Sequence, residues 1–188
     1  VTGLGYATVS DSGAAMRPIV ERLSILDQVW LARISRQAAP AWMVRWLRVA
    51  TLAGGATVTT SVPLLLLPWS GSRSFGLALL LANATSHACV QLLKRTVVRR
   101  RPHLSCDGVL ALGVIPDAFS FPSGHSAAAM ALAVPCLVRG GAAGVPALLL
   151  ALVVGASRVC LRVHYPSDVV AGQILGVAGG VFAVWIVY

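Results

Sequence analysis

Residues 170–188 read VAGQILGVAGGVFAVWIVY and contain no charged side chain. A helix needs about 20 predominantly apolar residues to cross a bilayer, so this stretch predicts a membrane-spanning helix. Gly172, Gly176 and Gly180 recur at every fourth position, a spacing that allows a second helix to approach closely. We expect these glycines to pack within one bundle, with dimerisation as the alternative. The fold class that follows is all-α and integral to a membrane.

Four further apolar stretches precede this one, at about 49–68, 75–93, 125–138 and 144–161. The composition agrees, because 57% of the 188 residues are hydrophobic and only 11% are charged, whereas soluble domains carry about 25% charged residues. We therefore predict a bundle of about five transmembrane helices that forms one domain over residues 49–188. Residues 94–122 are the one long loop expected in this domain, and a long loop in a compact protein is usually functional.

The N-terminal segment, residues 1–48, follows a different pattern. Apolar residues recur at helical spacing over 18–47 but charged residues interrupt them, so we predict an amphipathic interfacial helix that lies on the membrane. Trp42 and Trp46, interleaved with arginines, indicate an aromatic belt at the membrane surface. Residues 1–16 lack a basic stretch followed by an apolar core, so no secretory signal peptide is expected.

The formal net charge is +9, from 15 basic against 6 acidic residues. In a membrane protein such an excess anchors loops at anionic headgroups, so the expected partners are the bilayer and a membrane lipid, not nucleic acid. The four cysteines form no CxxC pair, which predicts buried thiols rather than a disulfide framework or a zinc site. No metal and no cofactor are expected, and the oligomeric state is not predicted.

Three short polar segments interrupt the apolar pattern. The first reads KRTVVRRRP and runs from Lys94 to Pro102. Lys94 and Arg101 are seven residues apart, so they share one face if the helix continues, and Pro102 then helps to end it. By itself such a basic run indicates an ordinary anchor at the membrane edge.

The second segment reads FPSGHS over residues 121–126 and leads into apolar sequence. Proline and serine are typical of a helix start, and Gly124 permits close approach of the backbone. The free N–H groups of a first helical turn bind anions with the help of the helix dipole, so His125 would lie beside a phosphate. A capping turn with an incidental histidine explains this segment equally well when it is taken alone.

The third segment reads SRVCLRVHYPSD over residues 157–168. Arg158 closes an apolar stretch, where an arginine is costly unless it meets an anion or reaches the interface. His164 precedes Asp168 by four residues, so the carboxylate can hold one imidazole nitrogen and orient the other for nucleophilic or basic work. An interfacial arginine with a structural His–Asp hydrogen bond is the alternative interpretation.

Alternating crossings bring these three segments to one membrane face. The end of the 75–93 stretch, the start of 125–138, the end of 144–161 and the start of 170–188 share that face. The opposite face holds only Arg73 and Arg139 among the basic residues. Convergence of distant polar segments at one depth is what a catalytic site in a membrane protein requires.

Together the three segments resemble the signature of the type 2 phosphatidic acid phosphatase family, which includes membrane lipid phosphatases, glucose-6-phosphatase and vanadium haloperoxidases. The resemblance covers about residues 94–168 and is complete at the key positions. It implies metal-independent hydrolysis of a lipid phosphate, with His164 as the nucleophile that forms a phosphohistidine, His125 as general acid and base, and Asp168 orienting His164. It further implies that the phosphate is bound by Lys94, Arg101, Ser123, Gly124 and Arg158.

A polar stripe on the 75–93 stretch bears on the substrate. Asn83, His87, Gln91 and Lys94 lie at helical spacing and are expected to face the bundle interior, either for interhelical hydrogen bonding or, for His87 and Gln91, for positioning of substrate. Phosphatidic acid, phosphatidylglycerophosphate and polyprenyl mono- or diphosphates all suit such a site. A polyprenyl-linked sugar phosphate is the alternative. The chain is short and its amino-acid composition suits a GC-rich bacterium, and in both respects it resembles the small decaprenylphosphoryl-phosphoribose phosphatases of cell-wall synthesis.

Two other functional classes compete with this interpretation. A vanadium haloperoxidase uses a similar oxyanion pocket, but those enzymes are soluble. A non-enzymatic lipid-phosphate transporter or binding protein does not need both histidines and Asp168. We expect a multi-pass protein of the cell membrane with a cytoplasmic active face, because that face and the N-terminal segment carry ten further arginines against the two opposite.

Overall fold

The computed structural model describes residues 17–36, 39–106, 108–115 and 117–188. The expectation about a signal peptide falls on residues 1–16, outside the described ranges. Within them the fold is helical, and the only strand-like pairing is an isolated bridge between Arg100 and Phe119. The helices are α1 (Arg17–Ser35), α2 (Ala41–Leu52), α3 (Ala56–Leu66), α4 (Arg73–Thr96), α5 (Pro102–Ser105), α6 (Gly124–Gly140), α7 (Val145–Cys160) and α8 (Pro166–Val187), with a 3₁₀ turn η2 (Gly141–Gly144) between α6 and α7.

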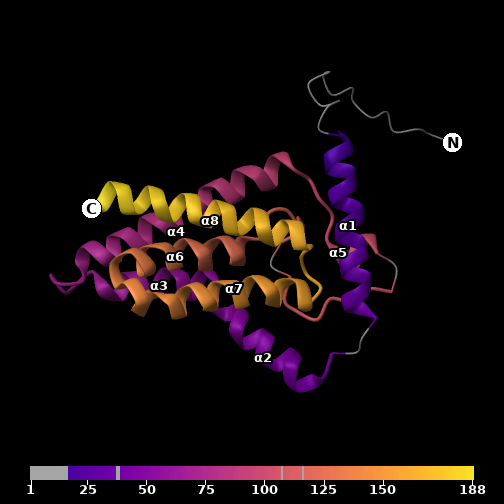
Figure 1. Cartoon of the computed structure of the whole chain (residues 1–188), viewed down its shortest axis with the longest axis horizontal. Coiled ribbons are helices and arrows are strands. Elements are labelled where there is room, and N and C mark those ends of the chain that lie inside the picture. Colours follow the sequence, from indigo (N-terminus) through magenta and orange to yellow (C-terminus); the bar gives the residue numbers. More distant parts are fainter. Residues whose placement is uncertain (1–16, 37–38, 107, 116) are drawn as a thin grey trace.

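The central bundle consists of α4, α6, α7 and α8, which lie side by side (Figure 1). Helix α8 packs on α6 through the predicted glycine stripe. A Cβ on Gly172 would lie 2.4 Å from the Ser123 carbonyl oxygen, and one on Gly176 would lie 2.4 Å from that of Ala127. Such distances exclude any side chain, so the stripe allows two backbones to touch inside the bundle, as expected.

Among the described residues, three helical stretches are long and apolar enough to cross a membrane, and a bent pair of helices would make a fourth if the two form one span. The stretches are Arg73–Thr96, Gly124–Cys160 and Pro166–Val187, and the bent pair is α2 with α3. The second stretch doubles back at η2 into the hairpin of α6 and α7, whose arms have 17 and 16 residues. The chain is a multi-pass membrane protein, whereas the number of five crossings stays a prediction.

The first apolar stretch differs from its predicted form. The sequence predicts one span over 49–68, but α2 and α3 meet there at 44°. The break lies at Gly54 and Gly55, and a Cβ on Gly54 would stand 2.6 Å from the carbonyl oxygen of His125. The interruption therefore lets the chain pass directly against the start of α6, where a straight helix with side chains would clash.

Helix α4 runs slightly beyond the predicted span of 75–93 but does not continue as far as Arg101. It stops at Thr96, five residues before Arg101, because Val97 takes an extended conformation with φ −106° and ψ 90°. Lys94 and Arg101 are therefore not two turns apart on one helix. An extended segment delivers Arg101 to the site instead, and Pro102 begins the short helix α5 rather than ending α4.

Helix α1 crosses the end of the bundle rather than running along it (Figure 1). Its Leu31 is fully buried against Val109 and Tyr165, and its Asp27 is 3% exposed. Trp30 on α1 and Trp42 and Trp46 on α2 are exposed. These features fit a helix at a membrane surface, but the interfacial location of residues 1–48 stays a prediction.

Candidate active site

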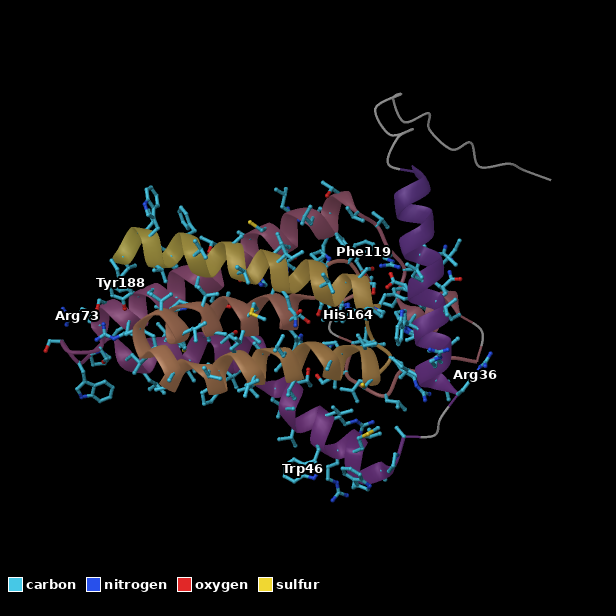
Figure 2. The ribbon with its side chains drawn as sticks, in the orientation of Figure 1. Arg36, Trp46, Arg73, Phe119, His164 and Tyr188 are labelled. Atoms are coloured by element: carbon cyan, nitrogen blue, oxygen red, sulfur yellow. The ribbon has the colours of Figure 1, made fainter. Side chains whose placement is uncertain are left out.

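One end of the bundle gathers the predicted site residues. Figure 2 shows His164 and Phe119 at the end crossed by α1, with Arg73 and Tyr188 at the opposite end. A cavity of about 570 Å³ opens at the His164 end. Lys94, Gly124, His125 and His164 line it, so residues from all three sequence segments meet there.

His164 lies in the turn between α7 and α8 and is 1% exposed. Its Nδ1 lies 2.7 Å from the carbonyl oxygen of Ser120, which can only accept a hydrogen bond, so Nδ1 carries the proton. Its Nε2 lies 3.2 Å from Nη1 of Arg101, which can only donate. Both partners select the same tautomer, in which Nε2 keeps the lone pair that a nucleophile needs.

The charge state of His164 suits the same role. Burial lowers its pKa to about 4, and the positive charges of Arg101 and Arg158 act in the same direction, against the opposing effect of Asp168. The imidazole is therefore neutral at pH 7. A neutral imidazole with a free Nε2 can attack phosphorus, whereas an imidazolium cannot.

Asp168 lies at the start of α8 and is fully buried. Its Oδ2 accepts from the backbone N–H of Tyr165 at 2.9 Å and from the hydroxyl of Ser120, and its Oδ1 accepts from Arg99 at 2.7 Å. The distance from Oδ2 to Nδ1 of His164 is 3.6 Å. The sequence motif assigns the orientation of His164 to Asp168 alone, whereas the structure places the Ser120 carbonyl closer, and Asp168 also holds Ser120.

Three cations surround the site, and all are buried. Lys94 is 6% exposed, Arg158 is 1% exposed and Arg101 is fully buried. Besides His164, Arg101 donates to the Val163 carbonyl at 2.8 Å. Arg158 donates to Thr51 at 3.0 Å, and its buried Nε has no hydrogen-bond partner within the described part of the chain. A buried guanidinium with an unused donor, as in Arg158, favours an anionic ligand.

Asp117 is a site residue that the sequence motifs did not identify. Its Oδ2 lies 2.7 Å from Nζ of Lys94, and its Oδ1 lies 2.9 Å from Nη2 of Arg101. Burial alone would raise the pKa of this carboxyl, but the hydrogen bonds and charges of Lys94 and Arg101 outweigh it and lower the pKa. One carboxylate thus bridges the two cations that the family resemblance assigns to phosphate.

The start of α6 forms another wall of the site. Gly124 lines the cavity, and the first-turn N–H groups that follow Ser123 have no acceptor in their own helix. The hydroxyl of Ser123 is fully buried and lies 2.9 Å from that of Ser126, while its N–H donates to the Asp168 carbonyl. The structure therefore offers backbone N–H groups to an anion at Gly124, and uses Ser123 to tie α6 to α8.

The polar stripe of α4 lies differently from its prediction. His87 and Gln91 are exposed rather than turned to a closed interior, and their side-chain nitrogens lie 3.4 Å apart. Asn83 donates to the Thr59 carbonyl of α3 at 3.2 Å. These side chains, with Thr59 and Thr60, line the same cavity as His164, so the stripe follows a groove that leads away from the site.

Metal ligands are not clustered here. Within the described ranges, no three His, Cys, Asp or Glu side chains are grouped as a metal ion would require. All four cysteines are free, but the prediction that they are buried is wrong: Cys89 is exposed, and Cys106, Cys136 and Cys160 are partly exposed.

Comparison with known proteins gives consistent matches. The sequence model of the PAP2 superfamily matches residues 75–188. The chain is 40% identical over 97 residues to decaprenylphosphoryl-5-phosphoribose phosphatase of Mycobacterium tuberculosis, covering 50% of this chain and 51% of that protein. It is 29% identical over 124 residues to undecaprenyl-diphosphatase of Sulfolobus acidocaldarius, covering 65% and 60%. The chain thus spans about half the length of the first of these relatives.

Two solved structures share the fold. LpxE of Aquifex aeolicus superposes with a TM-score of 0.74 at 24% identity, covering 85% of this chain and 95% of that one. A transmembrane PAP2 type phosphatidylglycerolphosphate phosphatase from Bacillus subtilis also gives 0.74 at 24% identity, covering 88% and 86%. At this identity the likeness establishes the helical architecture.

Proposed function

Because the chain belongs to the PAP2 superfamily, we propose that it hydrolyses a phosphate monoester or diphosphate on a membrane lipid through a phosphohistidine formed on His164. One observation carries the proposal. His164 is buried and neutral, and its Nε2 lies 3.2 Å from a guanidinium nitrogen of Arg101, at a cavity that Lys94 and His125 also line. That is the arrangement of a nucleophile beside a pocket for an anion.

In the first half of the proposed reaction, Nε2 of His164 attacks phosphorus and the bond to the leaving oxygen breaks. Arg101 first transfers its hydrogen bond from Nε2 to a phosphoryl oxygen, which frees the lone pair. Lys94, Arg101 and Arg158, with the N–H groups near Gly124, stabilise the negative charge of the transition state. His125, which carries a proton as an imidazolium once the phosphate anion is bound, donates that proton to the leaving oxygen, so the dephosphorylated lipid departs as an alcohol or, from a diphosphate, as a monophosphate.

In the second half, water attacks the phosphohistidine and the N–P bond breaks. His125, now a base, accepts the proton from water, and Nε2 recovers its lone pair. The Ser120 carbonyl keeps the proton on Nδ1 in both halves. Inorganic phosphate leaves, and the histidines return to their starting states without a metal or a cofactor in any step.

Asp117 has to leave Lys94 and Arg101 before phosphate can bind them. Its side chain is 40% exposed and lies in the loop before α6, so it can turn towards solvent without disturbing a helix. Departure of this carboxylate leaves three cations for the substrate. That charge suits a phosphate dianion together with the charge that develops in the transition state.

A lipid-linked sugar phosphate is a second candidate substrate, and the groove favours it. Asn83 lies eleven residues from Lys94 on α4, which is about 16 Å along the helix axis. Hydrogen-bonding groups line this length, namely Thr59, Thr60, Asn83, His87 and Gln91. A neutral polyhydroxylated unit between phosphate and tail would use these groups, whereas the short headgroup of phosphatidic acid would leave most of them unpaired.

The test is a phosphate-release screen with purified protein in detergent and EDTA. Phosphatidic acid, a polyprenyl diphosphate and a polyprenyl-linked sugar phosphate are compared, with and without His87→Leu and Gln91→Leu. We expect release that persists in EDTA, and a loss of about tenfold in kcat/KM in each variant for the sugar phosphate alone. Halide oxidation with vanadate but no phosphate release would favour the haloperoxidase class, and phosphate binding without release would favour a transporter or binding protein.

We further propose that the active face is cytoplasmic, in a cell membrane. Support comes from the arginines of that end, including exposed Arg36 and Arg48, under the positive-inside rule. Ala142→Cys in η2 and Leu104→Cys in α5 are a matched pair of exposed positions at the two ends. In intact cells a membrane-impermeant maleimide should label Ala142→Cys above the parent chain, and preferential labelling of Leu104→Cys would reverse the orientation.

A further inference from the structure

The N-terminal helix contributes a buried carboxylate to the edge of the active site. We propose that Asp27 of α1 is a positioning residue, which acts through Arg99 and Ser167 to fix Asp168 and thereby the Ser120–His164 contact. The proposal rests on the function proposed above, because it concerns the geometry of the same nucleophile. It assigns a catalytic contribution to a helix that the sequence pattern marks only as a membrane anchor.

The contacts of Asp27 are specific and buried. Its side chain is 4% exposed, although neighbouring positions on α1 such as Leu26 and Gln28 are exposed. Oδ1 accepts the backbone N–H of Ser167 at 3.0 Å, and Oδ2 accepts the hydroxyl of the same residue. Because Ser167 is the second residue of α8, Asp27 caps that helix from outside and neutralises the partial positive charge at its N-terminus.

Arg99 joins Asp27 to Asp168, the carboxylate beside His164. Its Nη2 donates to Asp27 at 2.7 Å, and its Nη1 donates to Asp168 at 2.7 Å and to the hydroxyl of Ser167 at 2.7 Å. The guanidinium also stacks over the ring of Tyr165, with its carbon 4.1 Å from the ring centroid. A planar guanidinium that is hydrogen-bonded through both terminal nitrogens and stacked on one face can take a single orientation. Arg99 therefore holds its positive charge at a fixed position beside Asp168.

The chain of contacts continues to the nucleophile. Asp168 accepts the hydroxyl of Ser120, and the carbonyl of the same residue accepts Nδ1–H of His164 at 2.7 Å. A shift of Asp168 therefore moves Ser120 and rotates the imidazole. By contrast, within the described part of the chain Asp27 forms hydrogen bonds and an ion pair with Ser167 and Arg99 and none with Lys94 or Arg101, whose carboxylate partner is Asp117. Loss of Asp27 should therefore slow the chemical step without weakening the binding of phosphate by Lys94 and Arg101.

A role for α1 as a membrane anchor alone makes the opposite prediction. Trp30, on the exposed side of α1, is 53% exposed and packs with Arg33, whose guanidinium carbon lies 5.8 Å from its ring centroid. If anchoring were the only contribution, Trp30→Ala would reduce activity and the isosteric Asp27→Asn would not. The two substitutions on one helix therefore separate positioning from attachment.

The experiment measures kcat, KM and inorganic phosphate binding for full-length Asp27→Asn, Arg99→Gln, the double variant and Trp30→Ala, on whichever lipid phosphate the screen identifies. We expect Asp27→Asn to lower kcat by about ten- to a hundredfold, because small misplacement of a reacting group costs that much, with KM and phosphate affinity within about twofold of the parent. Asp27→Asn should cost clearly less in the Arg99→Gln background, since both act through one link. Trp30→Ala should retain the parent kcat in lipid vesicles, where loss of an anchor would reduce activity.

Three outcomes would overturn the proposal. They are an unchanged kcat in Asp27→Asn, losses that add in the double variant, and loss of phosphate binding together with activity. The last would mean that Asp27 serves the fold as a whole, and phosphate binding also shows that a slow variant is folded. Failure of the proposed function is distinguishable, because the parent chain would then release no phosphate from any lipid.

Discussion

Substitution of Asp117 by asparagine tests whether a carboxylate occupies the phosphate site before substrate arrives. Asparagine keeps the shape of the side chain and removes its charge. In the parent chain the two carboxylate oxygens lie 2.7 and 2.9 Å from Lys94 and Arg101. Phosphate must displace them, so removal of the charge should make inorganic phosphate a stronger competitive inhibitor.

The magnitude follows from the two contacts. A hydrogen bond between charged groups contributes about 1.5–3 kcal/mol when buried, but pairs open to solvent contribute at most about 1 kcal/mol. Because the Asp117 side chain is 40% exposed, we assign about 1 kcal/mol to each contact. The amide oxygen of asparagine retains part of this, so the net gain for phosphate is about 1.4 kcal/mol, or about tenfold in the inhibition constant.

The assay is competitive inhibition of lipid dephosphorylation by inorganic phosphate, with Asp107→Asn as a control that makes the same change in net charge ten residues earlier. The inhibition constant should fall about tenfold in Asp117→Asn and stay at the parent value in Asp107→Asn. An unchanged or higher constant in Asp117→Asn would refute the reasoning. Asp117 would then hold Lys94 and Arg101 in place for phosphate instead of competing with it.

Three further predictions follow from the geometry. The pKa of His164 is lowered to about 4, so the acid limb of kcat/KM should fall below pH 5 instead of near the ordinary value of 6.5, as a pH-rate profile will show. Between pH 4 and 6.5 the unfolded state binds more protons than the folded state because of the same pKa shift. The contribution of His164 to the free energy of unfolding is therefore complete above pH 6.5 and lost as the pH falls towards 4. Chemical denaturation should show a loss of about 3 kcal/mol at most. Gly172→Ala should lower the thermal midpoint by about 2–4 °C, because its Cβ would lie 2.4 Å from a carbonyl oxygen, whereas Gly71→Ala, with nothing within 4 Å, should leave it unchanged.

Local sequence patterns predict much of this molecule because hydropathy and motif spacing are local properties. The stretch 170–188 predicts α8, and the glycine stripe predicts its packing on α6. Alternation of crossings places His125 and His164 at the same end. These conclusions need only helical geometry and the exclusion of polar backbone from lipid.

The remaining features depend on contacts between distant residues, which spacing does not encode. Asp27 meets Arg99 across 72 positions, and Asp117 meets Lys94 across 23. The extended segment that follows α4 at Val97 and carries Arg101 to His164 is likewise not encoded in the spacing of Lys94 and Arg101. A signal for the break in the first span was present, since Gly54 and Gly55 are adjacent helix-weakening residues, but their contact with His125 was not predictable.

The central claim is that Nε2 of His164 becomes phosphorylated, and trapping the intermediate tests it most directly. Lipid substrate labelled in its terminal phosphate is mixed with the parent chain, His125→Ala and His164→Ala, and the reaction is quenched in alkali, where phosphohistidine survives. The account predicts labelled protein in the parent chain. In His125→Ala the label should form more slowly, because the first step needs His125 as acid, and persist longer, because hydrolysis needs it as base. Acid should release the label, and His164→Ala should carry none. Equal labelling or undiminished phosphate release in His164→Ala would contradict it.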